Sequence, residues 1–141
     1  MDIKQTRDTM SATYFDALHI RNAVFVKEQG VPYALEMESP KDEAAAVHFV
    51  LYENGKALAT LRLLDNVLQR MAVLAEARGK GYANILLQAV IDFAKSAGIS
   101  ELMLHAQLSA LGLYDKFGFE PEGEIFEEAG IQHITMKKSL L

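Results

Sequence analysis

The sequence has no cysteine among its 141 residues, and it has no long uninterrupted run of apolar residues. The first absence excludes disulfide bonds, a thiolate nucleophile and metal sites built on thiolates, and it makes the cytoplasm the expected location. The second absence excludes a membrane-spanning helix, which needs about 20 apolar residues. Residues 1–4 are also not followed by the apolar core of a signal peptide, so we expect no membrane association.

Positive charge is also scarce. The formal net charge at pH 7 is -5, because 14 basic residues face 19 acidic ones. Without a basic field over the whole domain, general nucleic-acid binding is excluded, and any bound anion must be held by a local group of donors. The 4 histidines show no ligand spacing such as i, i+4, so we expect no metal site.

The residues that are present fit one ordinary globular domain over residues 1–141. Half of them are hydrophobic and 23% are charged, which is typical of such domains. The length allows one substantial core but not two, and the chain shows no internal repeat, low-complexity segment or interdomain linker.

Hydrophobic periodicity predicts a mostly antiparallel sheet. Asn54-Gly55 between two alternating apolar runs is the strongest hairpin signal, because a two-residue turn needs positive φ at both positions. A turn at Asp65-Asn66 adds a third antiparallel strand, and the strand–helix–strand segment after it requires a parallel crossover. The expected strands are residues 3–5, 47–52, 56–65, 67–74, 100–106, 123–128 and 131–137.

Helical spacing of apolar residues occurs in residues 14–26, 81–97 and 109–116. Thr9 or Ser11 caps the first helix, which stops before the breaker Gly30-Val31-Pro32. The acidic residues 33–45 are expected to form a loop beside the bound ligand. Together these elements define an α+β (mixed α/β) fold, in which helices cover both faces of a mixed sheet with one parallel strand pair.

The stretch Arg78-Gly79-Lys80-Gly81-Tyr82-Ala83 joins a predicted strand to the second predicted helix. The first amides of a helix lack partners within it, and the helix dipole places partial positive charge there, so such a junction can bind phosphate. The two glycines allow a tight turn and a close approach, and the arginine and lysine add full charges. The alternative is an ordinary helix-entry turn flanked by solvated charges.

Together with the downstream segment Leu113-Tyr114-Asp115-Lys116-Phe117-Gly118-Phe119, this loop resembles the GNAT superfamily of acetyl-coenzyme A-dependent N-acetyltransferases, and the likeness covers essentially the whole chain. Within the superfamily, the chain is similar to the bacterial YjcF-like and ElaA-like branch. The loop departs from the usual pattern at Glu76, where Gln or Arg is expected. We expect Glu76 to point away or to meet Arg78. The segments that carry the likeness to the branch are residues 20–32, His48, and residues 59–62, 106–107 and 130–133.

The resemblance implies the GNAT fold, acetyl-coenzyme A as cosubstrate, and a thioester bound between two diverging strands. The loop residues that would hold the pyrophosphate are Arg78, Gly79, Lys80, Gly81, Tyr82 and Ala83. Main-chain amides of Met71, Ala72 and Val73 would polarise the thioester carbonyl. Tyr114 would be the general acid, since a phenol with a pKa near 10 stays protonated at neutral pH and can hydrogen-bond the departing sulfur. A core aromatic is the alternative for Tyr114.

The group that accepts the amine proton stays open at this point. The candidates are Glu28, Glu36, His48, His105 and His133, and the alternative for each histidine is a structural role. Candidate residues for holding the acceptor are Arg21, Glu36, Arg62 and His133. The two arginines would bind an anionic group of the acceptor, or they would pair with the acidic residues 36–43.

The sequence therefore predicts an enzyme, an N-acetyltransferase acting on a primary amine of a small acceptor by direct attack in a ternary complex, because no cysteine can form an acyl-enzyme. Two alternatives within the enzyme class are an amino-sugar phosphate held by Arg21, Lys27 and Arg62, and a basic protein or peptide facing residues 36–43. A non-catalytic acyl-coenzyme A sensor is the alternative from another class, and Tyr114 argues against it. The oligomeric state is open, with a homodimer as one candidate.

Overall fold

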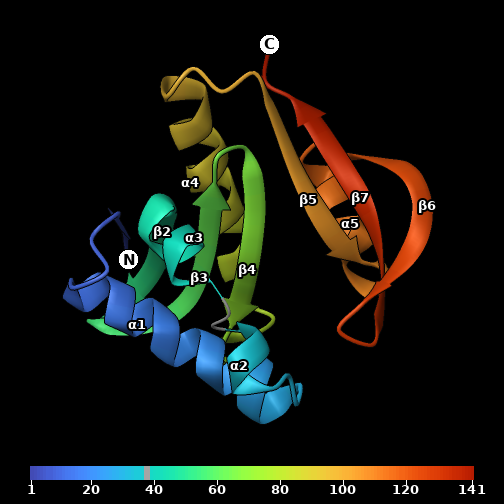
Figure 1. The fold of residues 1–141 in the computed structure, drawn as a ribbon. Helices are drawn as coiled ribbons and strands as arrows, with labels where there is room; N and C mark the ends of the chain where they lie inside the picture. Colours follow the sequence, from blue (N-terminus) through green and yellow to red (C-terminus); the bar gives the residue numbers. More distant parts are fainter. Residues whose placement is uncertain (37–38) are drawn as a thin grey trace.

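The computed structural model describes residues 1–36 and 39–141, and in them seven strands form one sheet in the order β1-β2-β3-β4-β5-β7-β6 (Figure 1). All neighbouring strands run antiparallel except β4 and β5, which are parallel. The predicted mixed sheet with one parallel pair is confirmed. The strands are β1 (Asp2–Thr6), β2 (Val47–Glu53), β3 (Lys56–Leu64), β4 (Val67–Val73), β5 (Glu101–Gln107), β6 (Glu120–Glu128) and β7 (Ile131–Ser139).

Helices cover both faces of the sheet, as predicted. Helices α1 and α4 both pack against β2, β3 and β4, and Figure 1 shows them on opposite sides of these strands. The helix predicted for residues 14–26 continues to Glu28, with a change from α to π hydrogen bonding at Asn22. The helical segments are α1 (Ala12–Arg21), η1 (Asn22–Glu28), α2 (Tyr33–Glu36), α3 (Pro40–Ala45), η2 (Ala75–Ala77), α4 (Tyr82–Ser96), η3 (Leu108–Ala110) and α5 (Leu111–Lys116). None of those in the described ranges has the length and apolarity that crossing a bilayer requires.

The prediction of a loop over residues 33–45 is wrong for the described part of that segment, which forms α2 and α3. The local signal for a helix stands at the start of α3. The hydroxyl of Ser39 accepts a hydrogen bond of 3.2 Å from the amide of Asp42, and Pro40 occupies the first helical turn. Asp42 and Glu43 then place negative charge at the positive end of the helix dipole.

The turn between β2 and β3 has the geometry that the sequence predicts. Asn54 and Gly55 have φ angles of 52° and 78°, both positive, as a two-residue turn that matches the twist of its strands requires. Beyond a register shift between Leu51 and Tyr52, Phe49 pairs with Leu61. Both side chains are almost fully buried in the core.

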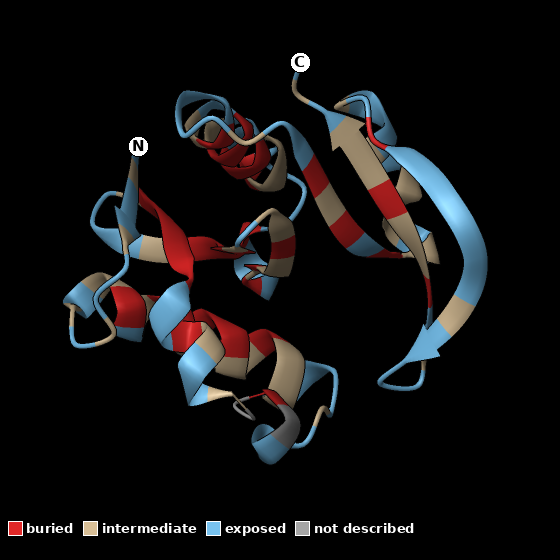
Figure 2. Ribbon diagram, turned by 45° about the horizontal axis from the view of Figure 1, so that its top comes forward, coloured by how far each residue is buried: buried red, intermediate tan, exposed pale blue. Residues whose placement is uncertain are grey.

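The core lies between the sheet and its two long helices. Strands β2 and β3 are buried along most of their length, and Figure 2 shows burial concentrated in these strands, α1 and α4. Helix α4 contributes its predicted apolar face, on which Leu86, Leu87 and Val90 are fully buried. At the edge of the sheet, β6 is exposed along nearly its whole length.

Strand β4 departs from regular geometry in its middle. Its register against β3 shifts between Thr60 and Arg62, so that two residues of β4, Arg70 and Met71, stand opposite Leu61. Arg70 has a φ of 58°, in the left-handed region that residues other than glycine seldom enter. This bulge bends β4 at the point where the site described below begins.

Strands β4 and β5 pair with each other only over the first two residues of β4 and the middle of β5. Val67 pairs with Met103 and Leu68 with Leu104, and no later residues of these two described strands pair with each other. Figure 1 shows the strands separating towards their carboxyl ends. The separation leaves main-chain donors and acceptors on the facing edges without a strand partner.

Candidate functional site

A cleft of about 810 Å³ lies in the opening between β4 and β5, with further walls from η1, α2, α5 and the β6–β7 hairpin. Its volume falls in the range of roughly 300–1,000 Å³ that small-molecule sites occupy. The structure thus brings together residues that are far apart in the sequence. Of the predicted site residues, Glu28, Glu36, Met71, Ala72, Val73, Arg78, His105, Tyr114 and His133 line this cleft.

The glycine loop ends at the amino terminus of α4, as predicted. Gly81 is the capping residue, with a φ of 80° and no side chain to satisfy the helix amides. The first helical hydrogen bond runs from the amide of Ile85 to the carbonyl of Gly81, so the amides of the first three helical residues have no helical acceptor. A Cβ atom on Gly79 or Gly81 would meet no atom within 4 Å, so the space above the loop is open.

A second hollow of about 150 Å³ lies over this loop and adjoins the cleft. Val73 and Arg78 line both hollows, so the two hollows are neighbours. Together the two hollows extend from the loop, past the open edge of β4, to the wall that carries Tyr114. The other residues around the second hollow are Ala77, Gly79, Gly81, Tyr82, Ala83 and Asn84.

Arg78 is already engaged by Glu28 at the mouth of the cleft. Nη2 of Arg78 lies 2.6 Å from Oε1 of Glu28, and Nη1 bonds the other carboxylate oxygen. Nε of Arg78 donates to the carbonyl of Val73 at 3.1 Å. The hydrogen-bonded guanidinium lowers the pKa of Glu28, so this carboxylate accepts a proton less readily. Glu28 is therefore the weaker candidate for the base.

The other charged and aromatic residues in and beside the glycine loop differ in their surroundings. Glu76 points away, with its carboxylate 3.4 Å from Nζ of Lys56, which is the first of its two expected placements. Lys80 is exposed to solvent. Tyr82 is buried, and its hydroxyl donates to Glu53, so this side chain fastens the loop to the end of β2.

Tyr114 reaches the cleft from α5. Its ring packs edge-on against Phe119, with ring centroids 6.0 Å apart. Burial raises the pKa of Tyr114 to about 12. The phenol therefore stays protonated at neutral pH and can donate a hydrogen bond into the cleft.

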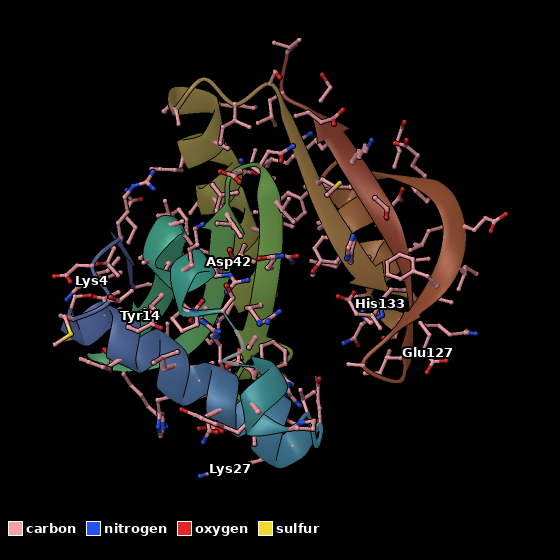
Figure 3. All side chains as sticks on the ribbon, viewed as in Figure 1. Lys4, Tyr14, Lys27, Asp42, Glu127 and His133 are labelled. Carbon is pink, nitrogen blue, oxygen red and sulfur yellow. The ribbon has the colours of Figure 1, made fainter. Side chains whose placement is uncertain are left out.

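His105 on β5 and His133 on β7 line the cleft, and both imidazoles pack against Phe126, with centroid distances of 5.0 and 5.9 Å to its ring. Figure 3 shows His133 on β7, across β4 from Tyr14 on α1. Nδ1 of His105 lies 3.3 Å from Oε2 of Glu128. Nδ1 of His133 lies 2.7 Å from the carbonyl of Ile131, which can only accept, so Nδ1 carries the proton and Nε2 is the acceptor in the neutral ring.

His48 lies outside the cleft. It is fully buried on β2, where Nε2 donates to the carbonyl of Glu43 at 2.9 Å and the ring packs edge-on against Tyr14. Burial also lowers the pKa of His48. This environment supports the structural alternative for His48, and we do not retain it as a base.

Arg21 and Arg62 are kept from the cleft by a buried cluster of ion pairs. Glu43 accepts hydrogen bonds from Nη1 of Arg21 at 2.7 Å, from Nη1 of Arg62, and from the hydroxyl of Tyr14 at 2.9 Å. Glu36 accepts from Nε and Nη2 of Arg21, both at 2.7 Å. Of the two sequence-based readings, the geometry supports ion pairing with the acidic segment rather than direct binding of an acceptor.

Arg70, Gln69 and Glu128 also line the cleft, although no sequence motif singles them out. Nε of Arg70 donates to Oε1 of Glu36 at 3.2 Å, and the amide oxygen of Gln69 accepts from Nη2 of Arg62. These placements follow from the bulge in β4 and from the β6–β7 hairpin. Neither the bulge nor the meeting of distant segments can be read from local spacing.

The acetyltransferase (GNAT) domain family matches residues 9–140, and the chain belongs to this family. It is accordingly an enzyme, an acyl-coenzyme A-dependent N-acyltransferase that acts on an amine. The non-catalytic sensor considered from the sequence is set aside on this ground.

Within the family, the predicted likeness to the YjcF-like and ElaA-like branch is confirmed. YjcF of Bacillus subtilis (strain 168), an uncharacterized N-acetyltransferase, is 35% identical over 128 residues, which cover 87% of this chain and 90% of YjcF. An acyl-CoA N-acyltransferase from Pseudomonas aeruginosa has a TM-score of 0.86 at 27% identity, covering 98% of this chain and 99% of that one. ElaA of Escherichia coli has a TM-score of 0.87 at 26% identity, covering 99% and 100%.

Replacing Glu43 with Gln should destabilise the fold by about 3–5 kcal/mol, because two buried guanidinium groups lose a charged partner. Burial alone would raise the pKa of Glu43, but Arg21 and Arg62 outweigh it and hold the pKa below its usual value of 4.5. The ionised carboxylate therefore stabilises the fold above pH 4.5, and this contribution is lost as the pH falls through the lower folded value. Urea unfolding of both proteins across this range measures the difference.

The matched control is Glu76→Gln, which removes a carboxylate from an exposed pair with Lys56. It should leave the free energy of unfolding nearly unchanged at every pH, because water screens such pairs. Equal losses in the two variants would contradict the role given to the buried cluster.

Proposed function

We propose that the enzyme transfers an acetyl group from acetyl-coenzyme A to a primary amine of a small acceptor, by direct attack in a ternary complex. The observation that carries this proposal is the pair of adjoining hollows that extend from the glycine loop to Tyr114. Acetyl-coenzyme A has the matching shape, because a long pantetheine arm joins its pyrophosphate to its thioester. The thioester supplies an activated carbonyl carbon when it is bound there.

The glycine loop suits the pyrophosphate because its donors belong to the main chain. The amides at the start of α4 have no helical acceptor, the space beside Gly79 and Gly81 is open, and the helix dipole adds partial positive charge. Lys80 contributes a full charge beside them. Arg78 remains hydrogen-bonded to Glu28, so the amides carry most of the phosphate binding.

Met71 completes the bulge in β4, and Ala72 and Val73 follow it, where β5 no longer pairs with this strand. Successive amides of a strand point to opposite neighbours, so β3 uses only part of this segment. The amides on the open side donate to the thioester carbonyl and stabilise the negative charge that develops on its oxygen.

In the reaction, the acceptor nitrogen bonds to the carbonyl carbon and the carbon–sulfur bond breaks. The amine loses a proton to His105 or His133, whose imidazoles both face the cleft. Tyr114 donates a hydrogen bond to the departing sulfur and supplies its proton, which solvent then replaces. Because burial raises the pKa of Tyr114 to about 12, the phenol is almost wholly protonated at neutral pH.

Replacing Gly81 with Asp should weaken acetyl-coenzyme A binding by about tenfold or more, because it places a carboxylate in the phosphate site. Isothermal titration calorimetry measures the affinity. Gly98→Asp is the control, since Gly98 has the same φ of 80°, lies just beyond the other end of α4 and is equally open. A loss of affinity shared by both variants, or by neither, would remove the loop from the phosphate site.

Replacing Tyr114 with Phe should lower kcat about tenfold or more while calorimetry shows acetyl-coenzyme A binding unchanged, because the ring stays and only the donor is lost. Thiol release from acetyl-coenzyme A reports the rate. Tyr33→Phe is the control, since the Tyr33 side chain is 63% exposed and lies outside the cleft. Full turnover in the Tyr114 variant would eliminate the acid role.

A further inference from the structure

We propose that the acceptor is a compact amine that carries a carboxylate, such as an amino acid, and that the guanidinium of Arg70 binds this carboxylate. The inference rests on the proposed function, since it concerns the acceptor of the same reaction. It replaces the earlier candidates for anion binding, Arg21 and Arg62, because both are sequestered by Glu36 and Glu43.

The bulge in β4 directs the side chain of Arg70 to the wall of the cleft, where the acceptor would bind. Gln69 bonds Arg62, and Arg70 bonds Glu36, so two successive residues of β4 reach towards the same buried ion-pair cluster. In a regular strand, successive side chains point to opposite faces. The positive φ of Arg70 is the cost of this arrangement, and such backbone outliers cluster at functional sites.

The guanidinium of Arg70 is held in place by Glu36 and still has hydrogen-bonding capacity left for a ligand. Nε donates to Oε1 of Glu36 at 3.2 Å, and Nη2 lies 3.5 Å from the main-chain oxygen of Glu36, which is a weak contact. That same Oε1 accepts two shorter bonds from Arg21, so it does not cancel the charge of Arg70 alone. The Arg70 side chain is 28% exposed, compared with 1% for Arg21 and 6% for Arg62.

Arg70 therefore presents part of its planar donor fork to the cleft, in an orientation fixed by Glu36. A guanidinium in this state matches a carboxylate, which it can bind through two parallel hydrogen bonds. Arg78, the other guanidinium on the cleft wall, is already paired in this way with Glu28. Within the described part of the chain, Arg70 is thus the cleft cation best placed to receive an anion.

The charges around Arg70 favour a monoanion over a phosphate. Glu28, Glu36 and Glu128 all line the same cleft, and a phosphate dianion would meet their negative field with about twice the charge of a carboxylate. Arg70 also directly precedes Met71, which begins the segment assigned to the thioester carbonyl. The anion and the attacking nitrogen must therefore sit close together, which suits a small amino acid better than a polyamine or a peptide chain.

The test is calorimetry with coenzyme A-saturated protein, titrated with free amino acids and with the corresponding amino acid amides. At least one free amino acid should bind about tenfold or more tightly than its amide, because a hydrogen bond between charged groups is lost in the amide. Arg70→Gln should reduce this ratio to near one, and Arg70→Lys should restore part of it. Arg7→Gln, at an exposed arginine outside the cleft, should keep the full ratio.

Equal binding of acids and amides to the wild-type protein, or an unchanged ratio in Arg70→Gln, would overturn the inference. Tighter binding of glucosamine 6-phosphate than of every free amino acid would overturn it in favour of an amino-sugar phosphate. Thiol release measured with the same panel separates the two proposals. Arg70-dependent carboxylate binding without thiol release would uphold the carboxylate site at Arg70 and defeat the proposed acetyl transfer, and turnover without carboxylate preference would do the reverse.

Discussion

Strand β4 is held by β3 along its length and by β5 only at its first residues, and the rest of the site depends on this asymmetry. A sheet that continued its pairing would satisfy every amide of β4 and leave no space beside it. Because pairing stops, the strand has donors to offer and the cleft has a place to form. The bulge in β4 follows immediately and turns Arg70 towards the acceptor side.

The buried ion-pair cluster supports this opening from one side. Glu43 links Arg21 of α1 with Arg62 of β3, and Glu36 links Arg21 with Arg70 of β4. The short helices α2 and α3 are therefore fastened to the long helix and to the sheet by charge. Such a cluster is costly to desolvate, but once formed it fixes the direction of each guanidinium.

Structural features that have a local cause could be predicted from the sequence. Asn54-Gly55 predicts its hairpin because few residue pairs adopt positive φ at both positions. The apolar face of α4 follows from the helical spacing of its apolar residues. The start of α3 also has a local signal, the serine cap and proline of Ser39-Pro40. The roles of Arg70 and Glu43 could not be foreseen, because they depend on a register shift and on contacts between residues 19 to 34 positions apart.

The exposed strand β6 affects whether two copies of this protein can associate through their sheet edges. It ends the sheet with unpaired main-chain groups, and it carries five carboxylates and one proline, at Glu120, Pro121, Glu122, Glu124, Glu127 and Glu128. A second copy adding its own β6 there would bring two rows of negative charge within a strand spacing of about 5 Å. Repulsion at neutral pH therefore works against growth of the sheet through this edge, which is a common protection against edge-to-edge aggregation.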